Sequence, residues 1–279
     1  MNLKMLLAAA AVSMIAGGAV AQTAEWRTVS PENLWVIDTS KGRVLVELEP
    51  RAAPAHIERI RTLTNRGFYD GLKFHRVIPN FMAQTGDPEG TGAGGSDLPD
   101  IKGEFSFRRG RDSGFAPVEN SGPGLRGIMG SLPIMTQPDA QMFVTADLKV
   151  GASGLFCPGV AGMARASSPD SANSQFYLMT GQNDALNGGY TTFGRVLQGL
   201  DVVRALKAGS DAEDGKVADP DVMTKVQLAS ALPEGQRPTV RVAVPGSAAF
   251  NAAVEAARTA RGAQFGICDV QPVVEVTGG

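Results

Sequence analysis

The stretch F-H-R-V-I-P-N-F-M-A-Q-T-G-D, which runs from Phe74 to Asp87, joins a cation, an amide and several large apolar side chains. Arg76 is a permanent cation with a planar set of donors, and Gln84 carries an amide that both donates and accepts hydrogen bonds. If the run is extended, alternate side chains share a face, so Arg76 lies on the side of Met82 and Gln84. Pro79 and Asn80 are expected to bend the strand and shift that register. A cation and an amide beside apolar side chains suit a neutral, polar and partly hydrophobic ligand, such as a peptide.

Two further blocks follow in order along the chain. Gly159 to Tyr177 reads G-V-A-G-M-A-R-A-S-S-P-D-S-A-N-S-Q-F-Y, and Ala185 to Val196 reads A-L-N-G-G-Y-T-T-F-G-R-V. Together with the first stretch, these blocks closely resemble the sequence pattern of the cyclophilins, which are peptidyl-prolyl cis-trans isomerases. Three ordered blocks at plausible spacing make the resemblance specific. Bacterial exported cyclophilins are similar to this chain in having a tyrosine at the position of Tyr190.

The resemblance implies a mainly β fold, a closed eight-stranded antiparallel barrel capped by two helices. The residue pattern agrees, because a hairpin, a helix and further strands between Gly-rich loops are typical of a barrel with helical caps. Val44, Val46 and Leu48 alternate as in a strand with one buried face. The expected elements are strands at 34–39 and 43–48, a helix at 53–66, a second helix at 199–208 and a barrel-closing strand at 223–232.

The first residues have the layout of an export signal. Lys4 forms a short basic region, Met5 to Ile15 form an apolar core, and Ala19-Val20-Ala21 is a small-x-small cleavage site. The apolar run is shorter than the ~20 residues of a membrane-spanning helix, so we expect cleavage and no stable membrane insertion. The protein is therefore predicted to be exported, to the periplasm of a bacterial envelope. The predicted layout is a signal peptide at 1–21, a lead-in at 22–33, a cyclophilin-like domain at 34–232 and a C-terminal extension at 233–279.

Two segments depart from the family pattern: an insertion at about 111–157 and the extension at 233–279. The insertion is interpreted as a surface excursion; a functional role is the alternative, because long loops in compact domains are often functional. The extension is too short to bury much core alone and should pack on the barrel or on the insertion. We expect a turn-rich approach to a strand at 122–130, a strand or short ordered piece at 141–146, and a β-α-β extension with a strand at 239–244, a helix at 247–261 and a strand at 264–276.

Composition excludes several classes of protein. The formal net charge is −2, so no basic excess attracts nucleic acid or an acidic membrane surface. The two histidines, His56 and His75, are not spaced as a metal site, so we predict no metal. His56 is expected to face solvent and His75 to be structural. Cys157 and Cys268 are predicted to form a disulfide in an oxidising compartment, with two free buried thiols as the alternative.

The resemblance also implies roles for individual residues. Arg76 matches the catalytic arginine, which would donate hydrogen bonds to the substrate carbonyl and to the pyramidal proline nitrogen; a surface ion pair is the alternative role. No cofactor is implied, because rotation about an amide needs no nucleophile or acid. The residues that match the family's substrate-binding positions are Phe81, Met82 and Leu186 in the proline pocket, Gln84, Ala164, Arg165 and Gln175 along the peptide groove, and Tyr177 and Tyr190 beside the pocket.

Three positions differ from the best-known eukaryotic pattern. Tyr177 stands in place of a pocket phenylalanine, so its hydroxyl needs a partner or water. Ala185 replaces a tryptophan that contributes to cyclosporin binding in the family, and we predict weak cyclosporin sensitivity. Tyr190 replaces a pocket histidine. These changes bear on inhibitor affinity and substrate preference more than on the reaction.

The resemblance predicts a prolyl isomerase that assists the folding of exported proteins. Its partners would be proline-containing peptides and unfolded exported proteins. A peptide-binding or chaperone module with weak catalysis is one alternative, since the insertion could cover part of the groove. A scaffold that uses the insertion and the extension as an interface in an envelope complex is another.

Overall fold

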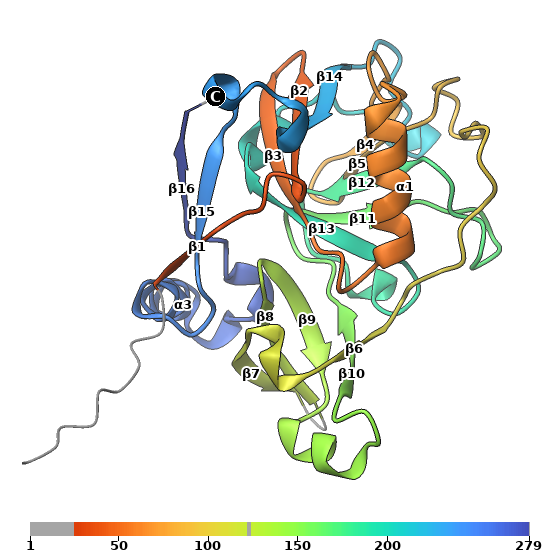
Figure 1. Ribbon diagram of the computed structural model, residues 1–279. Coiled ribbons are helices and arrows are strands. Elements are labelled where there is room, and N and C mark those ends of the chain that lie inside the picture. Colours follow the sequence, from red (N-terminus) through yellow and green to blue (C-terminus); the bar gives the residue numbers. More distant parts are fainter. Residues whose placement is uncertain (1–24, 122–123, 279) are drawn as a thin grey trace, which may run out of the picture.

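The computed structural model describes residues 25–121 and 124–278; the predicted signal peptide lies outside them. The chain is mainly β, and its largest sheet has eight antiparallel strands that curl around a hydrophobic core (Figure 1). The strands, in spatial order, are β14 (Met223–Leu228), β2 (Leu34–Thr39), β3 (Gly42–Leu48), β13 (Thr192–Gln198), β11 (Val160–Met163), β12 (Phe176–Met179), β5 (Met82–Thr85) and β4 (Arg76–Ile78).

The main sheet is an open, curled half-barrel. Its two edge strands are β14 and β4, and among the described residues they form no ladder with each other. The segments that precede them meet instead at an isolated bridge between Lys73 and Val222. The closed barrel expected from the resemblance is therefore not shown. The outer edge of β4 bonds instead to the segment from Gly209 to Val217, since Val77 exchanges backbone hydrogen bonds with Gly209 and Gly215.

Helices cover little of this sheet. α1 (Pro54–Asn65) begins with a proline in its first turn, as predicted, and buries Ile57, Ile60 and Leu63. His56 lies on the same buried face with no exposed surface, so its predicted solvent exposure is wrong. None of the helices in the described ranges is long and apolar enough to cross a bilayer. The other helices are α2 (Leu200–Arg204), which is shorter than predicted, α3 (Ala248–Arg261), and single or double 3-10 turns at Arg111–Ser113, Asp139–Val144, Asp184–Leu186, Asp211–Glu213, Ala229–Ala231, Glu234–Gln236, Gly262–Gln264 and Ile267–Asp269.

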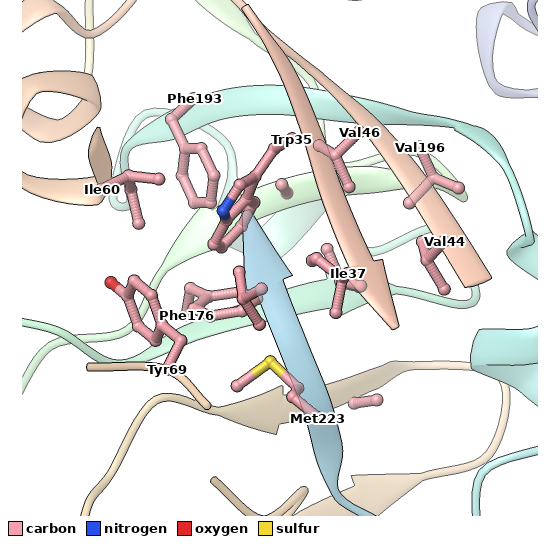
Figure 2. Close-up of a cluster of buried hydrophobic side chains, with 14 of the residues drawn as sticks. Trp35, Ile37, Val44, Val46, Ile60, Tyr69, Phe176, Phe193, Val196 and Met223 are labelled. Atoms are coloured by element: carbon pink, nitrogen blue, oxygen red, sulfur yellow. The ribbon is translucent and has the colours of Figure 1, made fainter. Parts of the chain in front are cut away.

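The predicted alternation in the first hairpin accounts for one face of the main sheet, and the opposite face is buried as well. Trp35, Val44 and Val46 point into the curl of the sheet (Figure 2). The aromatic rings around them come from the loop after α1, from β12 and from β13; they are Tyr69, Phe176 and Phe193. Trp35 lies 4.9 Å from the Phe176 ring between centroids and is fully buried. Leu45, on the opposite face of β3, is buried as well. That face is covered because Val240 and Val242, from the C-terminal segment, pack on it.

The insertion is not a loose excursion, because its four strands, together with β6 (Phe107–Arg109) just before it, form a five-stranded antiparallel sheet. The segment at 141–146, predicted as a strand or ordered piece, lies largely in the 3-10 turns of Asp139–Val144. Those turns connect two strands of this sheet, at the tip that projects farthest from α1 in Figure 1. The strands, in spatial order, are β6 (Phe107–Arg109), β10 (Val150–Gly154), β9 (Leu132–Thr136), β8 (Gly124–Met129) and β7 (Phe115–Ser121).

The C-terminal segment contains a strand, a helix and a strand, but it does not form a separate appendage. β15 (Thr239–Ala243) lies between β16 (Val274–Thr277) and β1 (Trp26–Thr28), so the lead-in completes this third sheet. The Ser247 hydroxyl accepts a hydrogen bond from the Phe250 amide and caps α3. The predicted final strand is much shorter than expected, because residues 264–273 form turns and irregular backbone.

The insertion, the C-terminal segment and the main sheet share one hydrophobic cluster. It contains Ile134 and Phe156 from the insertion, Phe250 and Val254 from α3, and Met179 from β12. Cys157 and Cys268 are joined by a disulfide within this cluster, with their Cα atoms 4.8 Å apart. The extension therefore packs on both the main sheet and the insertion.

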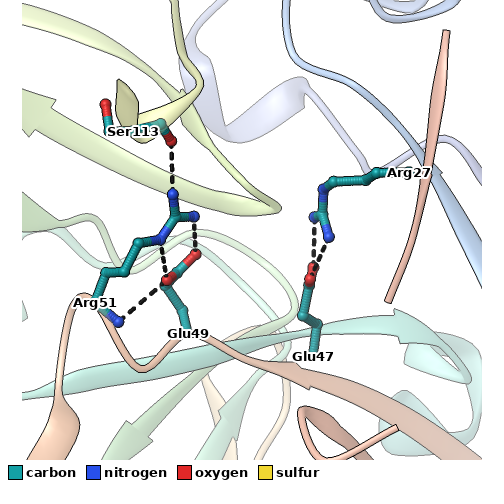
Figure 3. A network of polar contacts seen from close by, with 5 residues as sticks. All are labelled: Arg27, Glu47, Glu49, Arg51 and Ser113. Atoms are coloured by element: carbon teal, nitrogen blue, oxygen red, sulfur yellow. Dashed lines mark hydrogen bonds and ion pairs between the residues drawn. The ribbon is translucent and has the colours of Figure 1, made fainter. Parts of the chain in front are cut away.

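Polar contacts at the end of β3 reinforce this arrangement (Figure 3). Arg27 of β1 donates to the carboxylate of Glu47 at 2.8 Å, and Arg51 donates to the Ser113 carbonyl at 2.7 Å while it pairs with Glu49. The two glutamates are buried, so each depends on its arginine partner for solvation. The contact between Arg27 and Glu47 joins the third sheet to the main sheet, and the contact between Arg51 and Ser113 joins the main sheet to the insertion.

Candidate active site

A cavity of about 130 Å³ opens at one edge of the main sheet. Nine of the ten residues predicted for catalysis or substrate binding line it, and the tenth, Gln175, lines the cavity beside it. They come from β4, β5, β12 and the loops after β11 and β12. The nine are Arg76, Phe81, Met82, Gln84, Ala164, Arg165, Tyr177, Leu186 and Tyr190.

The hairpin of β4 and β5 places the polar pair. Asn80 adopts a left-handed backbone conformation after Pro79, so the chain reverses instead of continuing as one bent strand. Arg76 and Gln84 become direct cross-strand partners. They share a face for this reason, and not through alternation along a single strand.

Arg76 is held from two sides. On one side, its Nε donates to the backbone carbonyl of Asp214 at 2.9 Å, and Nη2 donates to the Asp214 carboxylate at 2.9 Å. On the other side, Nη1 donates to Gln84 Oε1 at 3.2 Å and lies 3.9 Å from the Met82 sulfur. Each terminal nitrogen carries a second hydrogen, so the guanidinium keeps donor capacity toward the cavity that it lines.

Two amides continue this network away from Arg76. Gln84 Nε2 donates to Gln175 Oε1 at 2.9 Å, and Gln175 Nε2 donates to the carbonyls of Gly92 and Gly94. The direction of the chain is fixed by chemistry, since a guanidinium only donates and a backbone carbonyl only accepts. Both glutamine amides must therefore be oriented as described, and the Gly-rich loop is tied to the arginine.

Aromatic rings form the apolar end of the cavity. Tyr177 lies 5.8 Å from Phe156 and 6.2 Å from Tyr190 between ring centroids. Gly162 leaves room for them, because a Cβ there would lie 2.6 Å from both Phe156 and Tyr177. The Tyr177 hydroxyl is buried and has no hydrogen-bond partner among the described residues, and burial raises the pKa of this phenol. This end of the cavity suits an apolar ring.

A larger cavity of about 600 Å³ adjoins the first and shares Gln84, Ala164 and Arg165 with it. Arg165 is fixed by hydrogen bonds to the carbonyls of Gly189 and Ala166, and its guanidinium lies 4.3 Å from the Tyr190 ring centroid. The two cavities together make an extended groove. Such a groove fits a peptide with one apolar residue inserted at its end.

His75 contributes no chemistry to this groove. It precedes β4 and is absent from the lining of both cavities of the groove, it is buried, and neither ring nitrogen has a hydrogen-bond partner among the described residues. Burial lowers its pKa, so the ring is neutral at neutral pH. Within residues 25–121 and 124–278, no three His, Cys, Asp or Glu side chains gather as a metal site.

Comparison with known proteins assigns the family. The profile of the family "Cyclophilin type peptidyl-prolyl cis-trans isomerase/CLD" matches residues 34–228. The chain is a cyclophilin. It is 36% identical over 233 residues to a "Probable peptidyl-prolyl cis-trans isomerase" of Brucella suis biovar 1, a match that covers 80% of this chain and 94% of that protein. It is 33% identical over 201 residues to the "Peptidyl-prolyl cis-trans isomerase-like 1" of Aspergillus fumigatus, with 72% of this chain and 96% of that protein covered.

A solved structure resembles this cyclophilin over nearly its whole length. The crystal structure of the cyclophilin AquaCyp293 from Hirschia baltica superposes with a TM-score of 0.81 at 32% identity, covering 91% of this chain and 94% of that one. That coverage exceeds the segment matched by the family profile, so the likeness extends into parts of the chain outside 34–228.

Two residues of the cyclophilin site escaped the sequence analysis. Phe156 packs behind the aromatic wall, but it lies in the segment assigned to the insertion. Asp214 binds Arg76 across 138 residues of sequence. Its sole local signal is the pair Asp214-Gly215, which is typical of a turn and does not indicate what the turn contacts.

Proposed function

We propose that this cyclophilin catalyses cis-trans isomerisation of X-Pro bonds in exported proteins, with Arg76 as the catalytic residue. The observation that carries the proposal is the placement of Arg76, whose donors border an apolar cavity lined by Phe81 and Leu186. Membership of the isomerase family supports the reaction type. The partners are proline-containing segments of unfolded or partly folded chains.

The reaction explains why one fixed arginine suffices. Rotation about an X-Pro amide faces a barrier of about 18–20 kcal/mol, because the C–N bond has partial double-bond character. As the bond twists, the nitrogen lone pair localises and becomes a hydrogen-bond acceptor. A donor at that point stabilises the twisted amide more than either planar isomer, and only such a difference accelerates the reaction. No cofactor enters this scheme.

The groove supplies the remaining requirements. The proline ring occupies the apolar end formed by Phe81, Met82 and Leu186, and Arg76 donates to the substrate carbonyl and then to the proline nitrogen. Gln84 hydrogen-bonds the peptide backbone, and the loop at Ala164 and Arg165 contacts the substrate main chain. Because Arg76 is already fixed by its neighbours, little reorganisation is needed when the substrate binds.

We also propose that the protein acts outside the cytoplasm, in a bacterial periplasm. The sequence of residues 1–21 supports export. The disulfide between Cys157 and Cys268 is compatible with this location, because such bonds persist in oxidising compartments.

The test is NMR exchange spectroscopy on a short Ala-Pro peptide with the chain from Gln22 to Gly279. Acceleration of exchange by the wild type is expected, and Arg76→Ala should lower kcat/KM by about 100-fold or more, the usual cost of removing a fixed donor. Arg241→Ala is the matched control, because Arg241 pairs with Glu275 at 2.8 Å on the third sheet, away from the groove. A wild type that does not accelerate exchange would refute the isomerase.

One observation favours an additional, non-catalytic role in binding unfolded chains. The exposed large hydrophobic residues of the described ranges are Met135, Phe143, Val144 and Leu148, and all four lie in the insertion. Concentrated apolar exposure marks interaction surfaces. Suppression of client aggregation that survives Arg76→Ala but is lost in the double variant Phe143→Ser, Leu148→Ser would support this role. Aggregation suppression unaffected by the double variant would count against it.

A further inference from the structure

We propose that Asp214 is a positioning residue for Arg76: it fixes the plane of the guanidinium so that the remaining donors face the proline cavity. This inference rests on the proposed function, in which Arg76 donates to the twisted amide. Asp214 is absent from the lining of the proline cavity and lines an adjoining cavity together with Arg76 and Gln84; its own hydrogen bonds go to the arginine.

The segment that carries Asp214 is tied to the strand that carries Arg76. The amide of Gly209 donates to the Val77 carbonyl at 2.9 Å, and the amide of Val77 donates to the Gly215 carbonyl at 2.8 Å. Gly215 approaches so closely that a Cβ there would lie 2.4 Å from the Ile78 side chain. The loop therefore extends the edge of β4 and cannot shift independently of Arg76.

The backbone at Asp214 aims two acceptors at one guanidinium. Its φ is 53°, the left-handed region that aspartate tolerates better than most residues. In this conformation the carbonyl oxygen accepts from Nε and the carboxylate accepts from Nη2, each at 2.9 Å. Two acceptors on adjacent nitrogens prevent rotation of the guanidinium plane, which a single ion pair would not do.

Gln84 completes the arrangement from the other side, at Nη1. With Nε and one hydrogen of Nη2 occupied by Asp214, the second hydrogen of Nη2 has a defined direction. A side chain as long as arginine loses much rotational freedom when it binds, and that loss is avoided if the orientation is set beforehand. The expected benefit is a higher kcat with little change in KM.

A purely structural role is a poor account of this contact. The Asp214 side chain is 80% exposed and that of Arg76 is 29% exposed, and ion pairs in such surroundings contribute little to stability. Asp214 would thus be expendable for folding. The carboxylate also places a negative charge beside the catalytic cation, which weakens the field of that cation. Asp214 weakens this field and yet makes two contacts with Arg76. Orientation of the guanidinium explains both facts.

Two variants separate orientation from charge. Asp214→Asn keeps an acceptor oxygen and tolerates the left-handed backbone but removes the charge, whereas Asp214→Gly keeps only the backbone carbonyl. We expect Asp214→Gly to lower kcat by about three- to tenfold with KM changed less than about twofold, and Asp214→Asn to retain most of the activity. Asp219→Asn is the control, because Asp219 forms an exposed ion pair with Lys207 and has no contact with Arg76.

A second readout does not depend on turnover. The Nε–H resonance of Arg76, assigned by its absence in Arg76→Lys, should exchange slowly with water in the wild type and in Asp214→Asn, and faster in Asp214→Gly. A wild type without isomerase activity but with this protected resonance would refute the proposed function while leaving the contact intact. Unchanged kcat in Asp214→Gly, or equal losses in the glycine and asparagine variants, would overturn the positioning role.

Discussion

Arg76 and Arg195 are both arginines, but they lie in different regions of the molecule. Arg76 lies in the candidate site, and Arg195 lies at the junction of the three sheets. Arg195 is fully buried and donates to the carbonyls of Ser131 and Val270, in the insertion and in the C-terminal segment. Among the described residues it has no carboxylate partner, and its Nε has no acceptor. Arg76 is partly exposed, bonds one carboxylate and one amide, and borders a cavity.

The difference shows what separates the structural Arg195 from Arg76, the arginine that we propose to be catalytic. Burial lowers the pKa of Arg195 to about 9, so the cation persists at neutral pH and is tolerated because carbonyls from two segments solvate it. Its donors point at protein. Arg76 donates to Asp214 and Gln84, keeps a second hydrogen on each terminal nitrogen, and lines the cavity. Charge and residue type are equal, and the two arginines differ in whether they are enclosed by protein or border a cavity.

The largest effect on stability is expected at the junction. Arg195→Met leaves the carbonyls of Ser131 and Val270 without a donor in a buried setting, which should lower the free energy of unfolding by about 2–4 kcal/mol. Arg76→Met should change it by less than about 1 kcal/mol, because its ion pair is exposed. Urea unfolding of both variants measures this. Equal losses in the two variants would break the comparison.

Lowering the pH is expected to have an intermediate effect on the free energy of unfolding. His56 and His75 both have pKa values lowered from 6.5, first by burial, although the Glu104 carboxylate opposes this at His56. The unfolded chain then binds protons at a higher pH than the folded chain, so stability is full above about pH 7 and falls as the pH drops below 6.5.

The free energy of unfolding should therefore be lower at pH 5.5 than at pH 7.5, with a slope of at most about 1.4 kcal/mol per pH unit for each histidine. Unfolding midpoints at pH 7.5 and 5.5 measure it. The double variant His56→Gln, His75→Gln should flatten the dependence, whereas Arg195→Met should keep it, because the arginine does not titrate in this range. A wild type with equal stability at both pH values would contradict the burial of neutral histidines.

The smallest effect is expected within the groove itself. Tyr177→Phe removes a buried hydroxyl that has no partner among the described residues. It should raise the free energy of unfolding by about 0.5–1 kcal/mol and change kcat/KM by less than about threefold, since the ring that forms the wall is kept. Thermal unfolding and peptide exchange on the same preparation would check both. A destabilised variant would mean that the hydroxyl is bonded after all.

Local patterns in the sequence were enough to predict the strands and helices whose formation depends on neighbouring residues. Alternation at Val44, Val46 and Leu48 predicted β3, and the apolar stripe after Pro54 predicted α1, because strand and helix periodicity act over a few residues. The compact signature at Phe74 to Asp87 predicted that Arg76 and Gln84 share a face, but their pairing across a hairpin was not predicted.

Tertiary structure alone decided the contacts between distant segments. The curl of the main sheet stops short of closure, β1 joins β15 across more than 200 residues, and Asp214 reaches Arg76 from a turn with no periodic signal. Such pairings depend on which surfaces remain unburied once the local elements have formed. The sequence by itself determined the family, the first hairpin, α1 and the residues of the groove. The folded chain determined what holds those residues in place, because the holding groups lie far away along the chain.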